Sequence, residues 1–451
     1  MSAGKLPEGW VECELSELGN IVTGKTPSTK EPSNFGGNIP FIKPGDLDLG
    51  GYIINTADTL TEKGLSLVPT LPANSVVVTC IGNLGKVGIT AKKSASNQQI
   101  NALIPSEKLN VKFVYYQILT LKPWLESQSA ATTIAIVNKS KFSQAPFKFP
   151  PLAEQKIIAE KLDTLLAQVN STKARLEQIP QILKRFRQAV LHVAVSGKLT
   201  EKWRLGNATL ENSYEWKVQS LSDLGVLARG KSKHRPRNDP RLFGDKYPFI
   251  QTGEVANSSG RIKGASKFYS EFGLSQSKLF PKDTLCITIA ANIADTAILE
   301  IEACFPDSVV GFISDKDKSH VSFVKYLIDV NKDNLEAFAP ATAQKNINLK
   351  VLNELKLPIP DIKEQREIVR RVEQLFAYAD TIEKQVNNAL ARVNNLTQSI
   401  LAKAFRGELT TQWRAENPDL ISGENSAAAL LEKIKAERAP SGGKKASRKK
   451  S

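Results

Sequence analysis

Histidine, methionine and cysteine are scarce in this sequence of 451 residues, which has 3 His, 1 Met and 4 Cys. The four cysteines are scattered and form no CxxC pair: Cys13, Cys80, Cys286 and Cys304. A structural zinc site needs closely spaced Cys or His ligands, and a disulfide framework needs a denser set of cysteines. The composition therefore argues against both.

Long hydrophobic runs are also missing. The most apolar stretch, residues 279–305, is interrupted by the charged residues Lys282, Asp283, Asp295, Glu300 and Glu302. A bilayer span does not tolerate that many charges. The first ten residues, MSAGKLPEGW, lack the apolar core of a secretory signal. We therefore expect a cytoplasmic protein with no membrane contact.

Catalytic motifs are absent from the sequence as well. It contains no HExxH, no helicase acidic box, no convincing nuclease cluster and no [DN]PP[YF] tetrapeptide, which Phe149 to Leu152 (FPPL) resembles only superficially. Two segments, Gly19 to Thr26 and Gly225 to Ser232, match the phosphate-loop pattern GxxxxGK[ST]. Each is followed by prolines where that loop requires a helix. We expect no catalytic residue, metal or cofactor on this chain.

Positive charge is abundant. Lys and Arg number 61 against 46 Asp and Glu, which gives a net charge of +15. Such an excess favours a polyanionic partner, although charge alone does not separate DNA from RNA or anionic lipid.

The sequence contains an internal duplication. Its repeated pairs are Trp10 and Trp216, residues 15–19 and 221–225 (LSELG and LSDLG), Glu154-Gln155 and Glu364-Gln365, and residues 197–204 and 407–414 (GKLTEKWR and GELTTQWR). The copies share only a skeleton of Gly, Pro and apolar positions before the Glu-Gln pair, and match in length and pattern after it. A scaffold that carries two different domains explains this contrast.

The matched parts have apolar or small residues at alternating steps of four and three, which is a heptad pattern. In the first copy these are Ile158, Leu162, Leu165, Val169, Thr172, Leu176, Ile179, Leu183, Phe186, Val190 and Val193, and in the second Ile368, Val372, Leu375, Ala379, Ile382, Val386, Ala389, Val393, Leu396 and Ile400. Each helix would be about 60 Å long. We expect the two to pair antiparallel within the chain, with a coiled-coil homodimer as the alternative. Pro180 predicts a kink or break in the first helix only.

The predicted fold is therefore two tandem α/β domains joined and spaced by a pair of long antiparallel coiled-coil helices. The expected boundaries are 1–153 for the first domain, 154–199 for the first long helix, 200–215 for a linker, 216–363 for the second domain, 364–409 for the second helix, and 410–451 for a C-terminal segment. In that segment Ala428, Leu430, Leu431 and Ile434 could form an apolar docking face, and a basic tail follows.

Polar and basic clusters in the domains are candidates for nucleic-acid contact, because Lys and Arg bind phosphates while Arg, Asn and Gln read base edges. A solvated loop is the plainer alternative for the basic residues 229–241, and a simple turn is the alternative for the amide cluster at residues 96–101. In the first domain the candidates are Lys25, Thr26, Ser28, Thr29, Lys30, Lys43, Asn97, Gln98, Gln99 and Asn101. In the second they are Arg229, Lys231, Ser232, Lys233, His234, Arg235, Arg237, Asn238, Arg241 and Gln251.

These features together resemble the specificity subunit of type I restriction-modification enzymes, most closely the IA subclass. The resemblance rests on two variable domains, each followed by a long helix headed by Glu-Gln and ending in GKLTEKWR or GELTTQWR. It implies a non-catalytic subunit whose domains each read one half of a bipartite, asymmetric site in double-stranded DNA, while the helices set the gap.

The resemblance also implies the partners. Two modification subunits would methylate adenine with S-adenosylmethionine, and two restriction subunits would translocate and cut DNA with ATP and Mg. The alternative function is a coiled-coil adaptor with duplicated protein-binding domains.

Overall fold

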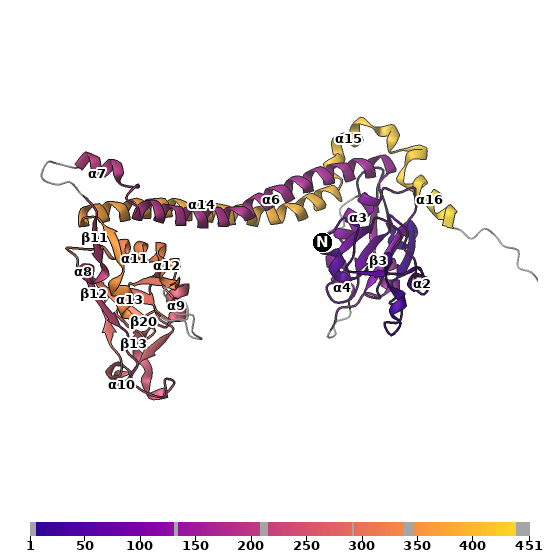
Figure 1. The fold of residues 1–451 in the computed structure, drawn as a ribbon. Helices are drawn as coiled ribbons and strands as arrows, with labels where there is room; N and C mark the ends of the chain where they lie inside the picture. Colours follow the sequence, from indigo (N-terminus) through magenta and orange to yellow (C-terminus); the bar gives the residue numbers. More distant parts are fainter. Residues whose placement is uncertain (1–5, 130–133, 208–214, 291–292, 338–346, 439–451) are drawn as a thin grey trace, which may run out of the picture. The chain divides into compact units, whose positions relative to one another are not determined.

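The computed structural model describes residues 6–129, 134–207, 215–290, 293–337 and 347–438. The chain divides into two compact units, one of residues 1–177 with 388–451 and the other of residues 178–387. Each unit contains one α/β domain and one end of both long helices (Figure 1). Each unit is therefore built from both halves of the duplicated sequence.

The first domain has three sheets, with strand orders β2-β9-β6-β7-β4, β5-β3-β8 and β1-β10. The strands are β1 (Val11–Glu14), β2 (Gly19–Thr23), β3 (Phe35–Ile42), β4 (Tyr52–Ile53), β5 (Asp58–Leu60), β6 (Val76–Thr79), β7 (Val87–Thr90), β8 (Ala95–Ser96), β9 (Ile100–Pro105) and β10 (Pro146–Phe149). The helices are α1 (Leu15–Leu18), η1 (Pro32–Asn34), η2 (Pro44–Leu47), α2 (Glu62–Leu65), α3 (Val111–Leu119), α4 (Lys122–Gln128) and α5 (Lys139–Ser143). Strand β6 (VVVT) is buried along its whole length and is mostly apolar, as expected for a strand in the middle of the largest sheet.

The second domain repeats this plan, with orders β12-β20-β17-β18-β14, β15-β13-β19-β16 and β11-β21. Its strands are β11 (Lys217–Ser220), β12 (Gly225–Arg229), β13 (Phe243–Phe249), β14 (Arg261–Ile262), β15 (Lys267–Tyr269), β16 (Leu279–Phe280), β17 (Leu285–Thr288), β18 (Thr296–Leu299), β19 (Ala303–Cys304), β20 (Val309–Ser314) and β21 (Lys356–Ile359). Its helices are α8 (Leu221–Leu224), η3 (Pro240–Leu242), α9 (Thr252–Asn257), α10 (Glu271–Ser275), α11 (Val321–Val330), α12 (Lys332–Ala337) and α13 (Leu349–Glu354).

Each domain is closed by pairing its first strand with its last. Val11 in β1 lies opposite Phe149 in β10, and Lys217 in β11 lies opposite Ile359 in β21. The chain then enters a long helix, α6 (Leu152–Val195) or α14 (Ile362–Ala404). Helix α6 continues through Pro180, so the predicted break is absent.

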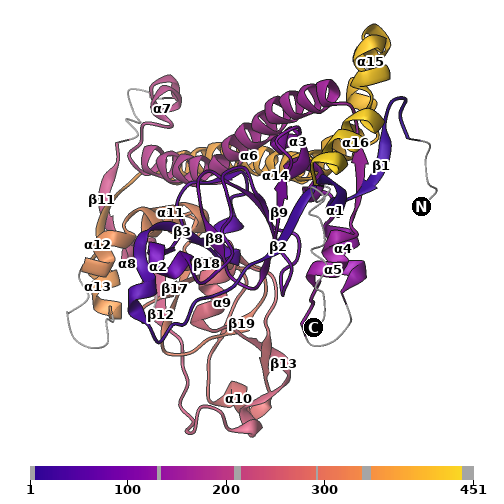
Figure 2. The same cartoon turned by 90° about the vertical axis from the view of Figure 1, so that its right-hand side faces the viewer.

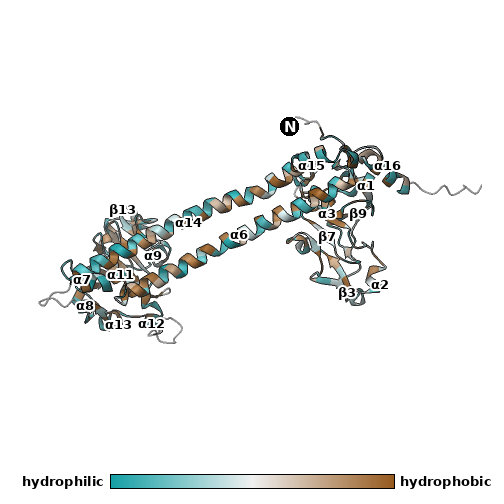
Figure 3. Cartoon of the chain, turned by 90° about the horizontal axis from the view of Figure 1, so that it is seen from above, coloured by the Kyte–Doolittle hydropathy of each residue, from teal (hydrophilic) through white to brown (hydrophobic). Residues whose placement is uncertain are grey.

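The two long helices pair antiparallel within one chain. In the first unit the start of α6 (Ile158, Leu162) shares a core with the end of α14 (Leu401, Ala404). In the second unit the end of α6 shares a core with the start of α14: Val190, Ala194, Ile368 and Val372. Figure 3 shows that hydrophobic residues recur along both helices. The pairing is within the chain, as the tandem repeat predicted.

Most heptad positions are buried or half-buried, with three exceptions. Thr172, Val193 and Leu396 are exposed. Beyond Val190 the buried position moves to Ala194, because there the helix packs against the second domain as well as against α14. At the ends of the helices the heptad pattern therefore gives way to packing against the domains, whereas the exposed Thr172 lies in the middle of α6.

Shorter helices follow each long one. After α6 comes α7 (Glu201–Asn207), and after α14 come η4 (Glu408–Thr410), α15 (Thr411–Glu416), η5 (Pro418–Leu420), η6 (Gly423–Asn425) and α16 (Ala427–Arg438). The apolar face predicted in the C-terminal segment is buried against the first domain through Ala427, Leu430, Leu431 and Ile434, whereas Ala428 is exposed. Within the described ranges, no helix has the length and hydropathy needed to cross a bilayer.

Candidate nucleic-acid interface

A buried glutamate of α6 joins the first domain to the segment that follows α14. Glu154, near the start of α6, is fully buried. Its carboxylate accepts hydrogen bonds from Trp10 Nε1 (2.8 Å), Thr410 Oγ1 (2.6 Å) and Arg414 Nη1 (2.5 Å). Arg414 also donates to the Gly407 carbonyl at 2.8 Å. The start of the first repeat is thereby tied to the end of the second.

The second unit contains the same junction with the repeats exchanged. Glu364 accepts hydrogen bonds from Thr200 Oγ1 (2.7 Å), Arg204 Nη2 (2.9 Å) and Trp216 Nε1 (3.1 Å). Arg204 donates to the Gly197 carbonyl at 2.6 Å. We call the two sites the Glu154 junction and the Glu364 junction. Their residues were visible in the sequence as repeats, but the repetition did not reveal their pairing.

The adjacent glutamines fix each domain to the helix it precedes. Gln155 donates to the Pro150 carbonyl and accepts from the Asn110 amide, and Gln365 does the same with Pro360 and His320. Buried polar groups therefore hold each domain to the start of the long helix that follows it.

In the first domain the structure brings two predicted clusters together. The amide of Lys25 donates to the Ser96 carbonyl at 2.9 Å, and Thr26 Oγ1 donates to Gln98 Oε1 at 2.7 Å. Lys25, Ser28, Thr29, Lys30 and Gln98 are exposed, and Thr26 and Gln99 are half-buried. These side chains form one polar surface, which we call the first-domain loop surface.

Two of the predicted amides do not belong to that surface. Asn101 is 2% exposed; it accepts a hydrogen bond from Thr23 and donates to the Val137 carbonyl. Asn97 is 7% exposed and accepts from the Gln99 amide. Asn101 therefore holds strands together and is not available to a base. Lys43 is half-exposed and lies 2.5 Å from Asp58.

In the second domain the basic loop, residues 229–241, is organised around Asp239. This carboxylate lies 2.7 Å from His234 Nε2 and 2.8 Å from Arg241 Nη2. The hydrogen bonds from Arg241 and His234 lower the pKa of Asp239, so the carboxylate stays charged. The Phe272 ring lies beside both His234 and Arg241. Because Phe272 belongs to α10, the loop lies at the end of the domain far from α14 (Figure 2).

The remaining basic residues of this loop fall into two groups. Arg229 donates to the Asp307 carbonyl, Arg237 forms an ion pair with Asp307 (3.1 Å), and Arg235 donates to the carbonyls of Ser232 and His234. Lys231 and Lys233 are exposed, and no ion pair holds either lysine to another part of the described chain. Asn238 and Gln251 are exposed and Ser232 is half-buried. The two lysines are therefore the side chains of this loop best placed for phosphates.

The phosphate-loop matches are excluded by their backbone. Residues 19–23 and 225–229 are strands, and the amides that would cradle a phosphate are used elsewhere. Gly24 N–H donates to the Ile100 carbonyl, and Gly230 N–H donates to the Val309 carbonyl. In the part of the chain that the structure describes, no group of His, Cys, Asp or Glu is arranged to hold a metal ion.

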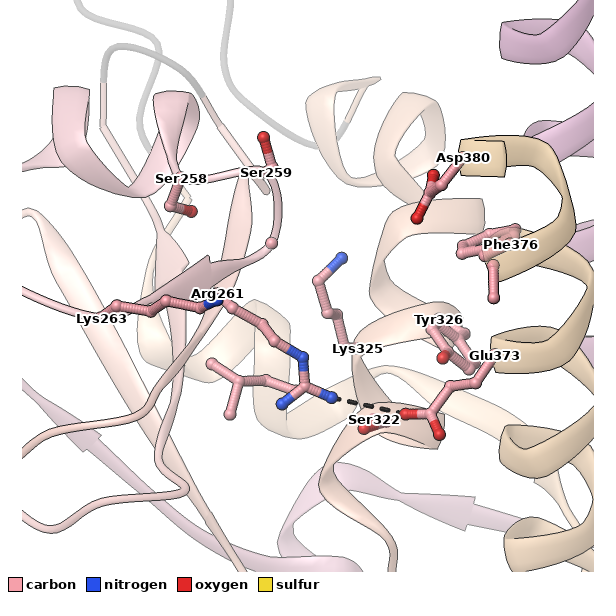
Figure 4. Close-up of a pocket in the computed structure, with 13 residues that line it drawn as sticks. Ser258, Ser259, Arg261, Lys263, Ser322, Lys325, Tyr326, Glu373, Phe376 and Asp380 are labelled. Carbon is pink, nitrogen blue, oxygen red and sulfur yellow. Dashed lines mark hydrogen bonds and ion pairs between the residues drawn. The ribbon is translucent and has the colours of Figure 1, made fainter. Parts of the chain in front are cut away.

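Sequence reasoning missed a cleft between the second domain and α14, with a volume of about 610 Å³. Figure 4 shows Arg261, Lys325 and Glu373 in it, with an Arg261–Glu373 ion pair of 3.4 Å. Lys325 pairs with Asp329 at 2.5 Å. The equivalent tether in the first domain is Lys112 to Asp163 on α6, also 2.5 Å. The two carboxylates, Asp163 and Glu373, are equivalent positions of the repeat, but their basic partners are not, because the counterpart of Lys112 is Ser322.

Comparison with known proteins agrees with this architecture. The family model described as "Type I restriction modification DNA specificity domain" matches residues 7–181 and 214–392. The chain is 42% identical to the EcoKI specificity subunit of Escherichia coli K12 across 100% of both chains. It is 41% identical to the EcoBI specificity subunit of Escherichia coli, across 98% of this chain and 95% of that protein.

A solved structure has the same fold. The HsdS subunit from Thermoanaerobacter tengcongensis aligns with a TM-score of 0.62 and 16% identity, over 90% of this chain and 99% of that one. The family match covers both domains and most of both long helices, and the full-length relatives exceed 40% identity. The chain therefore belongs to the family of type I restriction-modification specificity subunits.

Proposed function

We propose that this chain is the DNA-reading subunit of a type I restriction-modification complex. Each domain reads one half of a bipartite, asymmetric site in double-stranded DNA, and the paired helices set the gap between the halves. The observation that carries the proposal is the contrast between the two matched glutamate junctions and the unmatched loops. A constant scaffold with two different loop surfaces is what two unrelated half-sites require.

The chemistry of the complex belongs to the partners. Two modification subunits bind the conserved helical regions and methylate adenine with S-adenosylmethionine. Two restriction subunits join them and use ATP and Mg to translocate and cut DNA. This chain supplies the DNA sequence specificity and binds none of these cofactors.

Phosphates and bases are contacted by different groups. The exposed Lys25, Lys30, Lys231 and Lys233 neutralise phosphates. One arginine, Arg241, and four amides that are exposed or half-exposed, Gln98, Gln99, Asn238 and Gln251, supply base contacts in the major groove. Arg241 is held in one orientation by Asp239, which reduces the entropy lost on binding.

The proposal is tested with the complex of this chain and its modification subunits. The complex is incubated with a random duplex library, and the retained DNA is sequenced. We expect one motif of two specified halves separated by a constant gap. A complex that assembles but retains no specific DNA would favour the adaptor function.

The gap has its own test. Inserting seven residues, one full heptad, at facing positions of α6 and α14 keeps their pairing and lengthens both helices by about 10 Å. We expect a longer gap between unchanged half-sites. An unchanged gap would contradict the role of the helices as a spacer.

A further inference from the structure

The C-terminal helix α16 lies in a groove of the first unit. It packs against α1, and its apolar face joins the core that contains Trp10 and Phe149. Polar contacts fix its flank: Lys435 pairs with Glu17 at 2.9 Å, Glu437 pairs with Lys108, and Arg438 donates to the Ser16 carbonyl. We call this groove the first seat.

One carboxylate in the first seat has two tasks. Glu17 Oε2 accepts the Glu14 amide at 2.7 Å and so closes the start of α1, while Oε1 binds Lys435. A carboxylate that caps the helix at this position thus has a second oxygen that can bind a basic side chain of a docked helix.

The second unit has the same groove without the helix. Helix α8 repeats α1, and Ser222 and Asp223 stand where the first copy has Ser16 and Glu17. Asp223 Oδ2 accepts the Ser220 amide at 2.8 Å, as Glu17 does for Glu14. A cavity of about 710 Å³ lies here, lined by Glu215, Lys217, Gln219, Ser222, Asp223, Asp317, Lys318, Ile359, Pro360, Asp361 and Ile362. We call it the second seat; no helix of the described chain occupies it.

The lining of the second seat is acidic within a basic chain. Four carboxylates face two lysines, whereas the whole chain carries +15. Asp317 occupies the position that Lys108 has in the first domain. The amide of Asp315, two residues before Asp317, donates to the Leu224 carbonyl, just as the amide of Ser106, two residues before Lys108, donates to the Leu18 carbonyl. The lysine that pairs with Glu437 in the first seat is therefore replaced by an aspartate in the second seat.

The apolar part of the second seat is narrower. Val11 and Cys13 of β1 are replaced by Lys217 and Gln219 of β11, while Ile359 and Ile362 remain. Outside this lining, Val226 is 62% exposed and is the repeat counterpart of Asn20, which accepts a hydrogen bond from Arg438 at 3.4 Å. An occupant would contact a short aliphatic strip and a carboxylate rim.

We infer that the second seat receives one helix of a partner protein, with a narrow aliphatic edge and Lys or Arg on its flanks, including the position equivalent to Glu437. The precedent is α16 itself, and the complementary charge selects the partner. This inference goes beyond DNA reading and does not depend on it.

The probe is a fluorescent peptide of residues 422–438 of this chain carrying Glu437→Lys, titrated with the full chain. We expect saturable binding that Asp223→Lys weakens about tenfold or more, since a like charge then faces the basic flank. Ser222→Trp, which fills the groove without changing its charge, should have a similar effect. Asp245→Lys, an exposed carboxylate of the same domain outside the seat, is the matched control and should change nothing.

Circular dichroism confirms that each variant is folded before binding is measured. The peptide that retains Glu437 should bind more weakly than the Glu437→Lys peptide, because Asp317 repels it. Absence of binding, or binding that Asp223→Lys leaves unchanged, would overturn the inference. Self-association of the full chain that Asp223→Lys abolishes would overturn it too, because the occupant would then be a second copy.

Discussion

The Glu154 and Glu364 junctions have the same partners, a tryptophan, a threonine and an arginine, drawn each time from both repeats. The loop surfaces share no such correspondence. Residues 24–34 of the first domain are polar with few charges, whereas residues 229–241 of the second carry six Lys or Arg around one central Asp239. The two copies therefore share the residues that hold the domains to the helices and differ in the residues of the loop surfaces.

The largest effect is expected from substitutions that break the two junctions. Glu154→Ala leaves the Arg414 guanidinium, whose side chain is 11% exposed, without its carboxylate. We expect a loss of about 3–5 kcal/mol in the unfolding free energy of the first unit, measured by urea denaturation. Glu364→Ala should cost less, because Arg204 is 25% exposed. Equal costs would contradict the burial argument; Glu160→Ala, exposed on the same helix, is the control.

The second effect compares the two long helices. Pro180 lies inside α6, where its ring clashes with the preceding turn and it donates no helical hydrogen bond, whereas its counterpart in α14 is Leu390. Pro180→Ala should stabilise the protein by up to about 3 kcal/mol. Leu390→Pro should destabilise it by a similar amount. A destabilising Pro180→Ala would mean that the structure depends on the proline.

The third effect compares the two loop surfaces. We propose that Lys231 and Lys233 contact phosphates, so replacing both by Gln should lower the slope of log K against log salt by about 0.9 per lysine. Lys25 and Lys30 replaced by Gln should change the slope by a similar amount, since both are exposed. Neither pair should alter the sequence of the retained motif. A changed motif would contradict this assignment, because it would mean that these lysines contact bases and not phosphates.

The smallest effect concerns the thiols. All four cysteines are buried, two in each domain. Burial raises the pKa of Cys80 and Cys304 to about 11 and that of Cys13 to about 12, and also raises the pKa of Cys286. The native protein should therefore not react with a thiol reagent at pH 8, and the unfolded protein should react at four sites. Rapid reaction of the native protein at one thiol would identify a domain that opens locally.

The fold was largely predictable because the duplication and the heptads are local patterns. Buried strands such as Val76–Thr79 and the long helices follow from period and composition. The ends of the seam at Val193 and Leu396 were not predictable, because tertiary packing against the domains decides them.

The candidate surfaces were predictable by segment but not by residue. Asn101 and Gln98 look equivalent in the sequence, yet one lies in the strand ladder and the other on the surface. The Arg261–Glu373 tether joins residues distant in the sequence, so no local pattern points to it.

Exchange of one domain tests the central claim most directly. Residues 217–363 are replaced by the corresponding domain of the EcoKI specificity subunit, so that the Glu364 junction with Trp216 is retained, and the DNA motif bound by the assembled complex is determined. We predict that one half-site changes to a new sequence while the other half-site and the gap stay the same. A change in both half-sites, or in the gap alone, would contradict a constant scaffold carrying two independent readers.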